Sequence, residues 1–174
     1  MTDPNIVLTG FMATGKTSVG KQLARHLKYD FVDTDEIIVQ RAAMPVAEIF
    51  RTKGEPAFRQ MESDLAKELA RKNGLVIATG GGMMLDPENA SVLGKTGWIF
   101  CLVATPEEIF DRISRDTGAK RPLVESLDPM KQVARLLAQR EPTYKQFAQV
   151  KTSGKTPDEI TTGLLQILRK NTDQ

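Results

Sequence analysis

A glycine-rich loop near the amino terminus constrains this chain more than any other feature. Residues 10–17 read Gly-Phe-Met-Ala-Thr-Gly-Lys-Thr and match the pattern G-x-x-x-x-G-K-[ST]. The apolar run before the loop predicts a strand, and the apolar spacing over residues 16–27 predicts a helix after it. In this context backbone N–H groups and the positive end of the helix surround a phosphate group. The chain is therefore predicted to bind a nucleoside triphosphate.

The loop also assigns roles to single residues. Lys16 is expected to reach the β- and γ-phosphates, and the Thr17 hydroxyl is expected to ligate Mg²⁺. The predicted nucleotide-binding residues are Ala13, Thr14, Gly15, Lys16, Thr17 and Ser18. An ordinary glycine turn with a solvated lysine is the alternative, and the flanking strand and helix argue against it.

Two classes of nucleotide-binding protein do not fit the rest of the sequence. A guanine-nucleotide switch carries Asn-Lys-x-Asp, but no asparagine of this chain is followed by lysine. Motor ATPases carry a run of four apolar residues that ends in Asp-Glu, whereas Asp33 and Asp35 of this chain follow only a short apolar run. A small-molecule kinase remains the reading to test.

Composition narrows the partners and the location. The 174 residues are expected to form one domain, since 40% are hydrophobic and 26% are charged. A net charge of +2, with 24 basic against 22 acidic residues, fits a small anionic ligand better than nucleic acid. The single cysteine, Cys101, and the lack of a leader or a membrane-spanning run predict a cytoplasmic protein. No apolar stripe is left over, so a monomer is expected.

Strands and helices are predicted to alternate along the chain. Predicted strands cover residues 6–9, 31–32, 75–78, 98–103 and 148–151. Predicted helices cover residues 16–27, 37–42, 45–51, 57–71, 87–93, 107–114, 130–140 and 157–168, with a possible kink at Pro142. This alternation predicts an α/β fold with a parallel sheet covered on both faces. Residues 115–128 have charges but no periodicity and are expected to form a mobile loop.

Three further fragments suggest an acceptor site. Asp33 and Asp35 place two carboxylates on one side of an extended segment at a strand end, although a solvated turn with a helix cap is the alternative. Arg59 and Glu62 stand at i and i+3 on a helix, as a carboxylate clamp or a surface ion pair. Residues 80–82 are three glycines after a strand, where a ligand could approach the backbone or the chain could simply turn.

In their order and spacing these motifs resemble the shikimate kinase family. The matching fragments are Gly10-x-x-x-x-Gly15-Lys16-Thr17, Asp33-x-Asp35, Phe58-Arg59-x-x-Glu62, Gly80-Gly81-Gly82, Arg121-Pro122-Leu123 and Arg140-x-Pro142-x-Tyr144. The resemblance implies a three-layer P-loop kinase fold like that of nucleoside monophosphate kinases, with a five-stranded parallel sheet flanked by helices. It also implies a mobile lid at about residues 115–128 and acceptor-binding helices at about residues 35–62. The implied reaction is phosphorylation of the 3-hydroxyl of shikimate by ATP with Mg²⁺, in aromatic amino-acid biosynthesis.

The resemblance implies a role for each matching residue. Asp35 would accept hydrogen bonds from shikimate hydroxyls and help to deprotonate the attacking one, and Asp33 would hold a water on Mg²⁺. Arg59 and Arg140 would pair with the shikimate carboxylate, and Gly81 would offer its N–H to the substrate. The implied catalytic residues are Lys16, Asp35 and Arg121, of which Arg121 would reach the ATP phosphates from the lid. Phe50, Phe58, Pro122 and Leu123 would surround the ring.

The chain departs from the family pattern at two places. The family often has glycine where this chain has Ala13, and a positive φ there would cost an alanine about 1 kcal/mol. The lid varies in length, so Arg115 as an adenine-stacking residue is a guess, and Lys120 could share the phosphate role of Arg121.

Two other functions stay open at this stage. A related kinase, such as a gluconate kinase, would share the loop and the fold, and its acceptor also carries a carboxylate. The second is a regulatory protein that binds ATP without catalysis. Against it, the implied catalytic residues Lys16, Asp35 and Arg121 are all present in this chain. The only histidine, His26, is expected at the end of a helix without a functional role.

Overall fold

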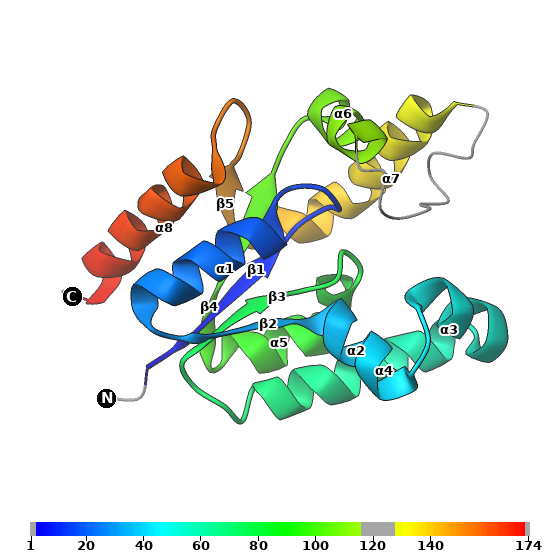
Figure 1. The fold of residues 1–174 in the computed structure, drawn as a ribbon, viewed down its shortest axis with the longest axis horizontal. Coiled ribbons are helices and arrows are strands. Elements are labelled where there is room, and N and C mark those ends of the chain that lie inside the picture. The colour runs from blue at the N-terminus through cyan, green and yellow to red at the C-terminus, as the bar shows by residue number, and fades with distance from the viewer. Residues whose placement is uncertain (1–2, 116–127, 173–174) are drawn as a thin grey trace.

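A parallel β-sheet forms the centre of the structure, a computed structural model that describes residues 3–115 and 128–172 (Figure 1). The strands are β1 (Asn5–Thr9), β2 (Asp30–Asp33), β3 (Leu75–Ala78), β4 (Gly97–Val103) and β5 (Ala148–Lys151). Their order is β2-β3-β1-β4-β5, and every neighbouring pair is parallel. The predicted five-stranded parallel sheet is thereby confirmed.

Helices cover both faces of the sheet. On one face α1 (Lys16–Leu27) packs beside α8 (Pro157–Thr172), and on the other α4 (Glu55–Leu69) packs beside α5 (Pro87–Gly94) (Figure 1). The remaining helices are α2 (Thr34–Ala42), α3 (Val46–Lys53), α6 (Pro106–Arg115) and α7 (Pro129–Tyr144), and a short 3₁₀ helix covers Met83–Leu85. The three layers are those of the predicted fold.

The central strand β1 holds the two helical layers apart. Its side chains alternate between the faces, so Ile6 and Leu8 pack among residues of α1 and α8, while Val7 packs among residues of α3 and α4. All five residues of β1 are buried. The loop that follows this strand is therefore anchored in the most enclosed part of the molecule.

The parallel register brings three chain segments to one edge of the sheet. Leu8 of β1 pairs with Ala78 of β3, and Ala78 pairs with Asp33 of β2. Three segments therefore leave adjacent strands side by side. They are the glycine-rich loop, the turn of residues 80–82, called the Gly80 turn below, and the acidic segment of residues 33–36. Ligands of open α/β sheets bind at such carboxyl ends.

The structure corrects two predicted segments. Asp33 is the last residue of β2, but Asp35 lies in α2, which begins at Thr34 and is capped by the Asp33 carboxylate, so the two residues do not share one extended segment. The predicted helix at residues 130–140 continues past Pro142 to Tyr144, which puts Arg140 and Tyr144 one turn apart on α7. The bounds of α1, β3 and β5 agree with the prediction. Of the predicted lid, residues 116–127 lie outside the described part of the chain.

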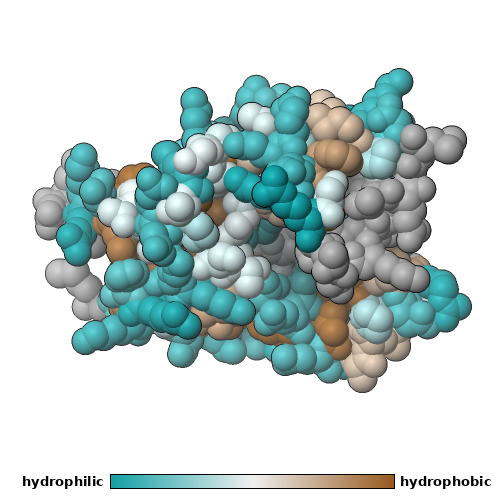
Figure 2. Space-filling model, turned by 45° about the horizontal axis from the view of Figure 1, so that its top comes forward, coloured by the Kyte–Doolittle hydropathy of each residue, from teal (hydrophilic) through white to brown (hydrophobic). Residues whose placement is uncertain are grey.

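Hydrophilic residues cover most of the surface in view in Figure 2, and hydrophobic residues form small separate groups there. The large hydrophobic side chains that stand out on the described surface are Trp98, which is 41% exposed, and Ile167, which is 40% exposed. Trp98 lies near the start of β4, and Cys101 of the same strand is buried. No helix within residues 3–115 and 128–172 is long and apolar enough to cross a membrane.

Candidate active site

The glycine-rich loop between β1 and α1 is already curled in this structure. Lys16 Nζ donates to the carbonyls of Gly10 at 2.9 Å and Phe11 at 2.8 Å, and the buried Thr14 hydroxyl donates to the Phe11 carbonyl at 2.8 Å. Gly15 caps α1 with a φ of 96°, a conformation that favours glycine. Because the side chains of the loop hold its own carbonyls, the loop keeps its shape around the predicted phosphate position.

The backbone of Ala13 lies in the left-handed region. This conformation was in question because the family often has glycine at this position. The φ of Ala13 is 59°, which is costly for a residue with a Cβ atom. The Arg112 guanidinium of α6 donates to the Ala13 carbonyl at 3.0 Å and lies 3.5 Å from the Thr152 hydroxyl. This arginine helps to hold the loop in the strained conformation.

We expect the substitution Ala13→Gly to stabilise the chain. Relief of the left-handed strain outweighs the extra freedom of glycine in the unfolded state, which leaves a gain of roughly 0.5 to 1 kcal/mol in the free energy of unfolding. Urea denaturation measures this value. The matched control is Ala47→Gly, at an exposed position inside α3, which should lose up to about 1 kcal/mol. A loss at both positions would show that Ala13 carries no strain.

Thr17 and Asp33 lie together beside the loop and offer oxygen atoms for a cation. The Thr17 hydroxyl donates to Asp33 Oδ2 at 3.0 Å, while Asp33 Oδ1 accepts the Asp35 N–H at 3.1 Å. Hydroxyl and carboxylate oxygens fit Mg²⁺, which keeps several waters and binds substrate phosphates. No cluster of three or more metal-ligating acids, histidines or cysteines occurs in the described residues.

Asp35 stands in the first turn of α2 with its carboxylate against the Gly80 turn. Burial, and secondly the charge of Asp33, raise its pKa above the ordinary value, while Lys16 and Arg59 oppose the shift. A carboxylate with a raised pKa is a better proton acceptor near neutral pH than an exposed one. The raised pKa therefore agrees with the predicted role of Asp35 as a proton acceptor.

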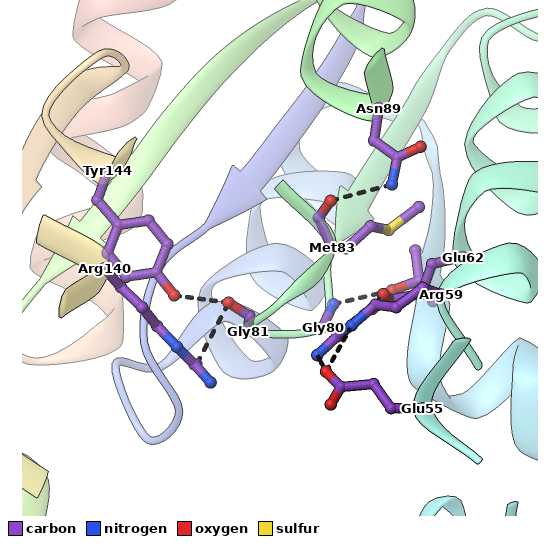
Figure 3. A network of polar contacts seen from close by, with 10 residues as sticks. Glu55, Arg59, Glu62, Gly80, Gly81, Met83, Asn89, Arg140 and Tyr144 are labelled. Atoms are coloured by element: carbon purple, nitrogen blue, oxygen red, sulfur yellow. Dashed lines mark hydrogen bonds and ion pairs between the residues drawn. The ribbon is translucent and has the colours of Figure 1, made fainter. Parts of the chain in front are cut away.

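The three consecutive glycines each make room for one charged side chain. A Cβ atom at Gly80 would collide with the Asp35 carboxylate, and one at Gly82 would collide with the Arg59 guanidinium. At Gly81 a Cβ atom would lie 3.3 Å from Arg140 Nη1. Figure 3 shows Arg140 and Arg59 approaching the turn from opposite sides. Three predicted acceptor-binding side chains thus converge on one turn, where glycines are required for their close approach.

Arg59 is held by two glutamates of its own helix. It donates to Glu62 Oε2 at 2.7 Å and to Glu55 Oε1 at 2.9 Å (Figure 3). Arg59 and Glu62 thus form the ion pair that the alternative named, but the Glu62 side chain is only 1% exposed and does not lie on the surface. Burial raises the pKa of Glu62, and Arg59 opposes the shift. Glu62 Oε1 is buried without a hydrogen-bond partner in the described structure.

Arg140 differs from Arg59 in having no acidic partner among the described residues. Its guanidinium carbon lies 5.2 Å from the centre of the Phe11 ring. A cation without a paired acid is the stronger candidate for an anionic ligand, and an arginine fork matches a carboxylate. Phe50 and Phe58, whose ring centres are 4.9 Å apart, form an aromatic pair beside Arg59.

Some predicted site residues are not among the residues that the structure describes, and some contacts in the site were not predicted from the sequence. Arg121, Pro122, Leu123 and Lys120 lie outside the described residues. The missed contacts are those of Arg112 with the loop and of Thr34, whose buried hydroxyl accepts the Gly80 N–H at 2.9 Å. The sequence around Arg112 and around Thr34 contains no local pattern that predicts such a contact. His26 is exposed in the last turn of α1, as expected.

Comparison with known proteins identifies the family that shares these features. The family model for shikimate kinase matches residues 12–169. A shikimate kinase from Thermodesulfovibrio yellowstonii is 46% identical over 158 residues, which is 90% of each chain. The structure of shikimate kinase from Acinetobacter baumannii in complex with shikimate superposes with a TM-score of 0.89, at 33% identity, over 98% of this chain and 95% of that one.

A more distant structure bears on the gluconate alternative. The gluconokinase from Sinorhizobium meliloti superposes with a TM-score of 0.60 at 18% identity, over 99% of this chain and 98% of that one. Identity this low shows a shared fold alone.

Proposed function

The chain belongs to the shikimate kinase family, and on this premise we propose that it transfers the γ-phosphoryl group of ATP to the 3-hydroxyl of shikimate at the site around the Gly80 turn. The observation that supports this site most is the convergence of Asp35, Arg59 and Arg140 on three successive glycines next to the phosphate loop. A base and two arginines are what a hydroxylated monocarboxylate requires.

The nucleotide side of the proposed site is the loop and the start of α1. We propose that the phosphates lie against residues 13–18, with the Lys16 ammonium group at the β- and γ-phosphates in place of the carbonyls that it now contacts. Thr17 and, through water, Asp33 would hold Mg²⁺, which supplies positive charge to the phosphoryl group when it is bound. Arg121 is proposed to approach the phosphates from the lid. Phosphoryl transfer depends mainly on such positioning and charge.

The acceptor side lies between α2, α4 and α7. Asp35 would accept the proton of the attacking hydroxyl, and Arg59 with Arg140 would bind the carboxylate. Gly81 would donate its N–H to the substrate, since this group has no acceptor among the described residues. Phe50 and Phe58 from the described chain, with Pro122 and Leu123 from the lid, would surround the ring. A single domain, a monomer and a cytoplasmic location remain predictions.

One assay tests the function. Purified protein with Mg-ATP is supplied in turn with shikimate, gluconate, a nucleoside monophosphate or no acceptor, and ADP release is followed by a coupled assay. We expect turnover with shikimate only, and ³¹P NMR of the product should place the phosphate on the 3-oxygen. Turnover with gluconate instead, or ATP binding without turnover, would contradict the proposal while leaving the phosphate loop intact.

We expect the substitution Arg140→Ala to weaken acceptor binding without loss of ATP affinity. A hydrogen bond to a charged group contributes about 1.5 to 3 kcal/mol, so the KM for shikimate should rise roughly 10- to 100-fold. The control is Arg135→Ala, an exposed arginine on the same helix, which should leave both constants unchanged. Steady-state kinetics with each substrate varied in turn measures the effect. An unchanged KM for shikimate would remove Arg140 from the acceptor site.

A further inference from the structure

Two side-chain hydroxyls bond to the backbone of the Gly80 turn, and Figure 3 shows that of Tyr144 at the Gly81 carbonyl. The Thr34 hydroxyl accepts the Gly80 N–H at 2.9 Å, and the Tyr144 hydroxyl donates to the Gly81 carbonyl at 2.6 Å. The Gly80 carbonyl accepts the Met83 N–H at 3.2 Å. The backbone groups on either side of the Gly81 N–H are therefore held by hydrogen bonds. These neighbours fix the direction in which that N–H points.

The bond from Tyr144 is the stronger of two that reach the same carbonyl. Arg140 Nη1 also points at the Gly81 carbonyl, but at 3.5 Å, the limit of a hydrogen bond. The Tyr144 side chain belongs to a residue only 3% exposed, and its ring packs with Phe11 and Val133. The tyrosine is thus held by its burial, and its hydroxyl is the closer donor to the carbonyl, with Arg140 at the limit of a second bond.

The protonation state of Tyr144 agrees with this arrangement. Burial raises the pKa of its hydroxyl, and Arg140 opposes the shift. The group therefore remains a hydrogen-bond donor at neutral pH, as the short bond to Gly81 requires.

We propose that Tyr144 is a positioning residue for the acceptor: its hydroxyl fixes the Gly81 carbonyl and thereby frees the donors of Arg140 for the acceptor's carboxylate. The inference rests on the proposed function and assigns a role to a residue that does not itself touch the substrate. Without the hydroxyl, the carbonyl would lack a strong donor, and the nearest cation, Arg140, would turn toward it. The acceptor would then compete with the protein backbone for one guanidinium.

The variant Tyr144→Phe tests the role because it keeps the buried ring and removes only the hydroxyl. We expect the KM for shikimate to rise about 5- to 10-fold, with kcat and the KM for ATP changed less than about 2-fold. Tyr29→Phe is the matched control, since Tyr29 is the only other tyrosine and packs between α1 and α8, away from the site. A fall in kcat with an unchanged KM for shikimate would overturn the proposal.

A double substitution separates positioning from a merely structural role. In the Arg140→Ala background, Tyr144→Phe should raise the KM for shikimate less than about 2-fold, because the residue on which it acts is gone. Effects that simply multiply would overturn the proposal. Gly81→Ala approaches the same geometry from the backbone, since its Cβ atom would lie 3.3 Å from Arg140 Nη1, and it should also raise this KM. If the unmodified protein fails to phosphorylate shikimate, the proposed function fails instead of this inference.

Discussion

Replacing Lys16 with methionine should lower kcat on the order of 10³-fold at saturating shikimate and ATP, while the KM for shikimate stays within about 2-fold. Methionine keeps most of the length of the side chain and removes the ammonium group. In the structure that group rests on the carbonyls of Gly10 and Phe11 at the rim of the loop, where it can move to the phosphates without a change of backbone. Stabilisation of charge that develops on the transferred group is then lost.

The control for this variant lies on the same helix. Lys21 is exposed on α1, with its ammonium group 5.7 Å from the centre of the Phe31 ring, so Lys21→Met removes a charge of the same kind away from the loop. We expect Lys21→Met to retain kcat. Rapid-quench measurement of a single turnover tests whether the chemical step itself is slowed in Lys16→Met. A normal rate of that step would assign Lys16 to the structure of the loop alone.

The fold could be predicted because its signals are local. Apolar runs such as residues 75–78 and the amphipathic spacing of α1 are visible within a dozen residues, and their alternation leads to a parallel sheet. The order of the strands, β2-β3-β1-β4-β5, was not predicted, since local signals do not say which strands pair. The two corrected segments are also instructive. A capping aspartate, Asp33, starts a helix where an extended segment was expected, and α7 continues through Pro142 to Tyr144 although a proline cannot donate to the carbonyl four residues before it.

The candidate site was predictable where a residue acts through its own motif, and not where it acts through a distant partner. Lys16, Thr17 and Asp35 follow from short patterns. The bond from Arg112 to the Ala13 carbonyl joins residues 99 apart, and that from Tyr144 to the Gly81 carbonyl joins residues 63 apart. Nothing in the spacing of a single sequence brings such pairs together, because tertiary packing alone decides them.

The glycine turn has a structural use that the sequence did not indicate. Three glycines were expected where a ligand approaches the backbone. In the structure they first admit the protein's own side chains, since Asp35 and Arg59 occupy the positions where Cβ atoms of Gly80 and Gly82 would stand. The glycines therefore let two predicted acceptor-binding side chains approach the same turn.

The substitution Asp35→Asn should lower kcat roughly 10²- to 10⁴-fold, the range typical for loss of a general base. Asparagine keeps the shape of the side chain but cannot take the proton of the attacking hydroxyl. The exposed neighbour Glu36 provides the control, and Glu36→Gln should retain activity. Asp35→Glu would lengthen the side chain and move the carboxylate toward the glycine turn, although the Asp35 carboxylate already lies close against Gly80. This variant should therefore not restore the rate.

The pH dependence gives this prediction its sharpest test. Because burial and Asp33 raise the pKa of Asp35, kcat/KM should fall as the pH drops through that raised value, at a higher pH than for an exposed aspartate. The residual rate of Asp35→Asn should lack this acidic limb. A limb that persists in the variant would assign it to another group.

Stability should move in the opposite direction to activity. A carboxyl whose pKa is raised on folding binds protons more readily in the folded state, so its ionisation lowers the free energy of unfolding as the pH rises above the value for the unfolded chain. At neutral pH the full penalty is present, and Asp35→Asn should remove it and raise the melting temperature. A less stable variant would mean that lost packing contributes to its low activity. A more stable and inactive variant would show that the chain keeps a buried charge at Asp35 for the reaction and at the expense of its fold.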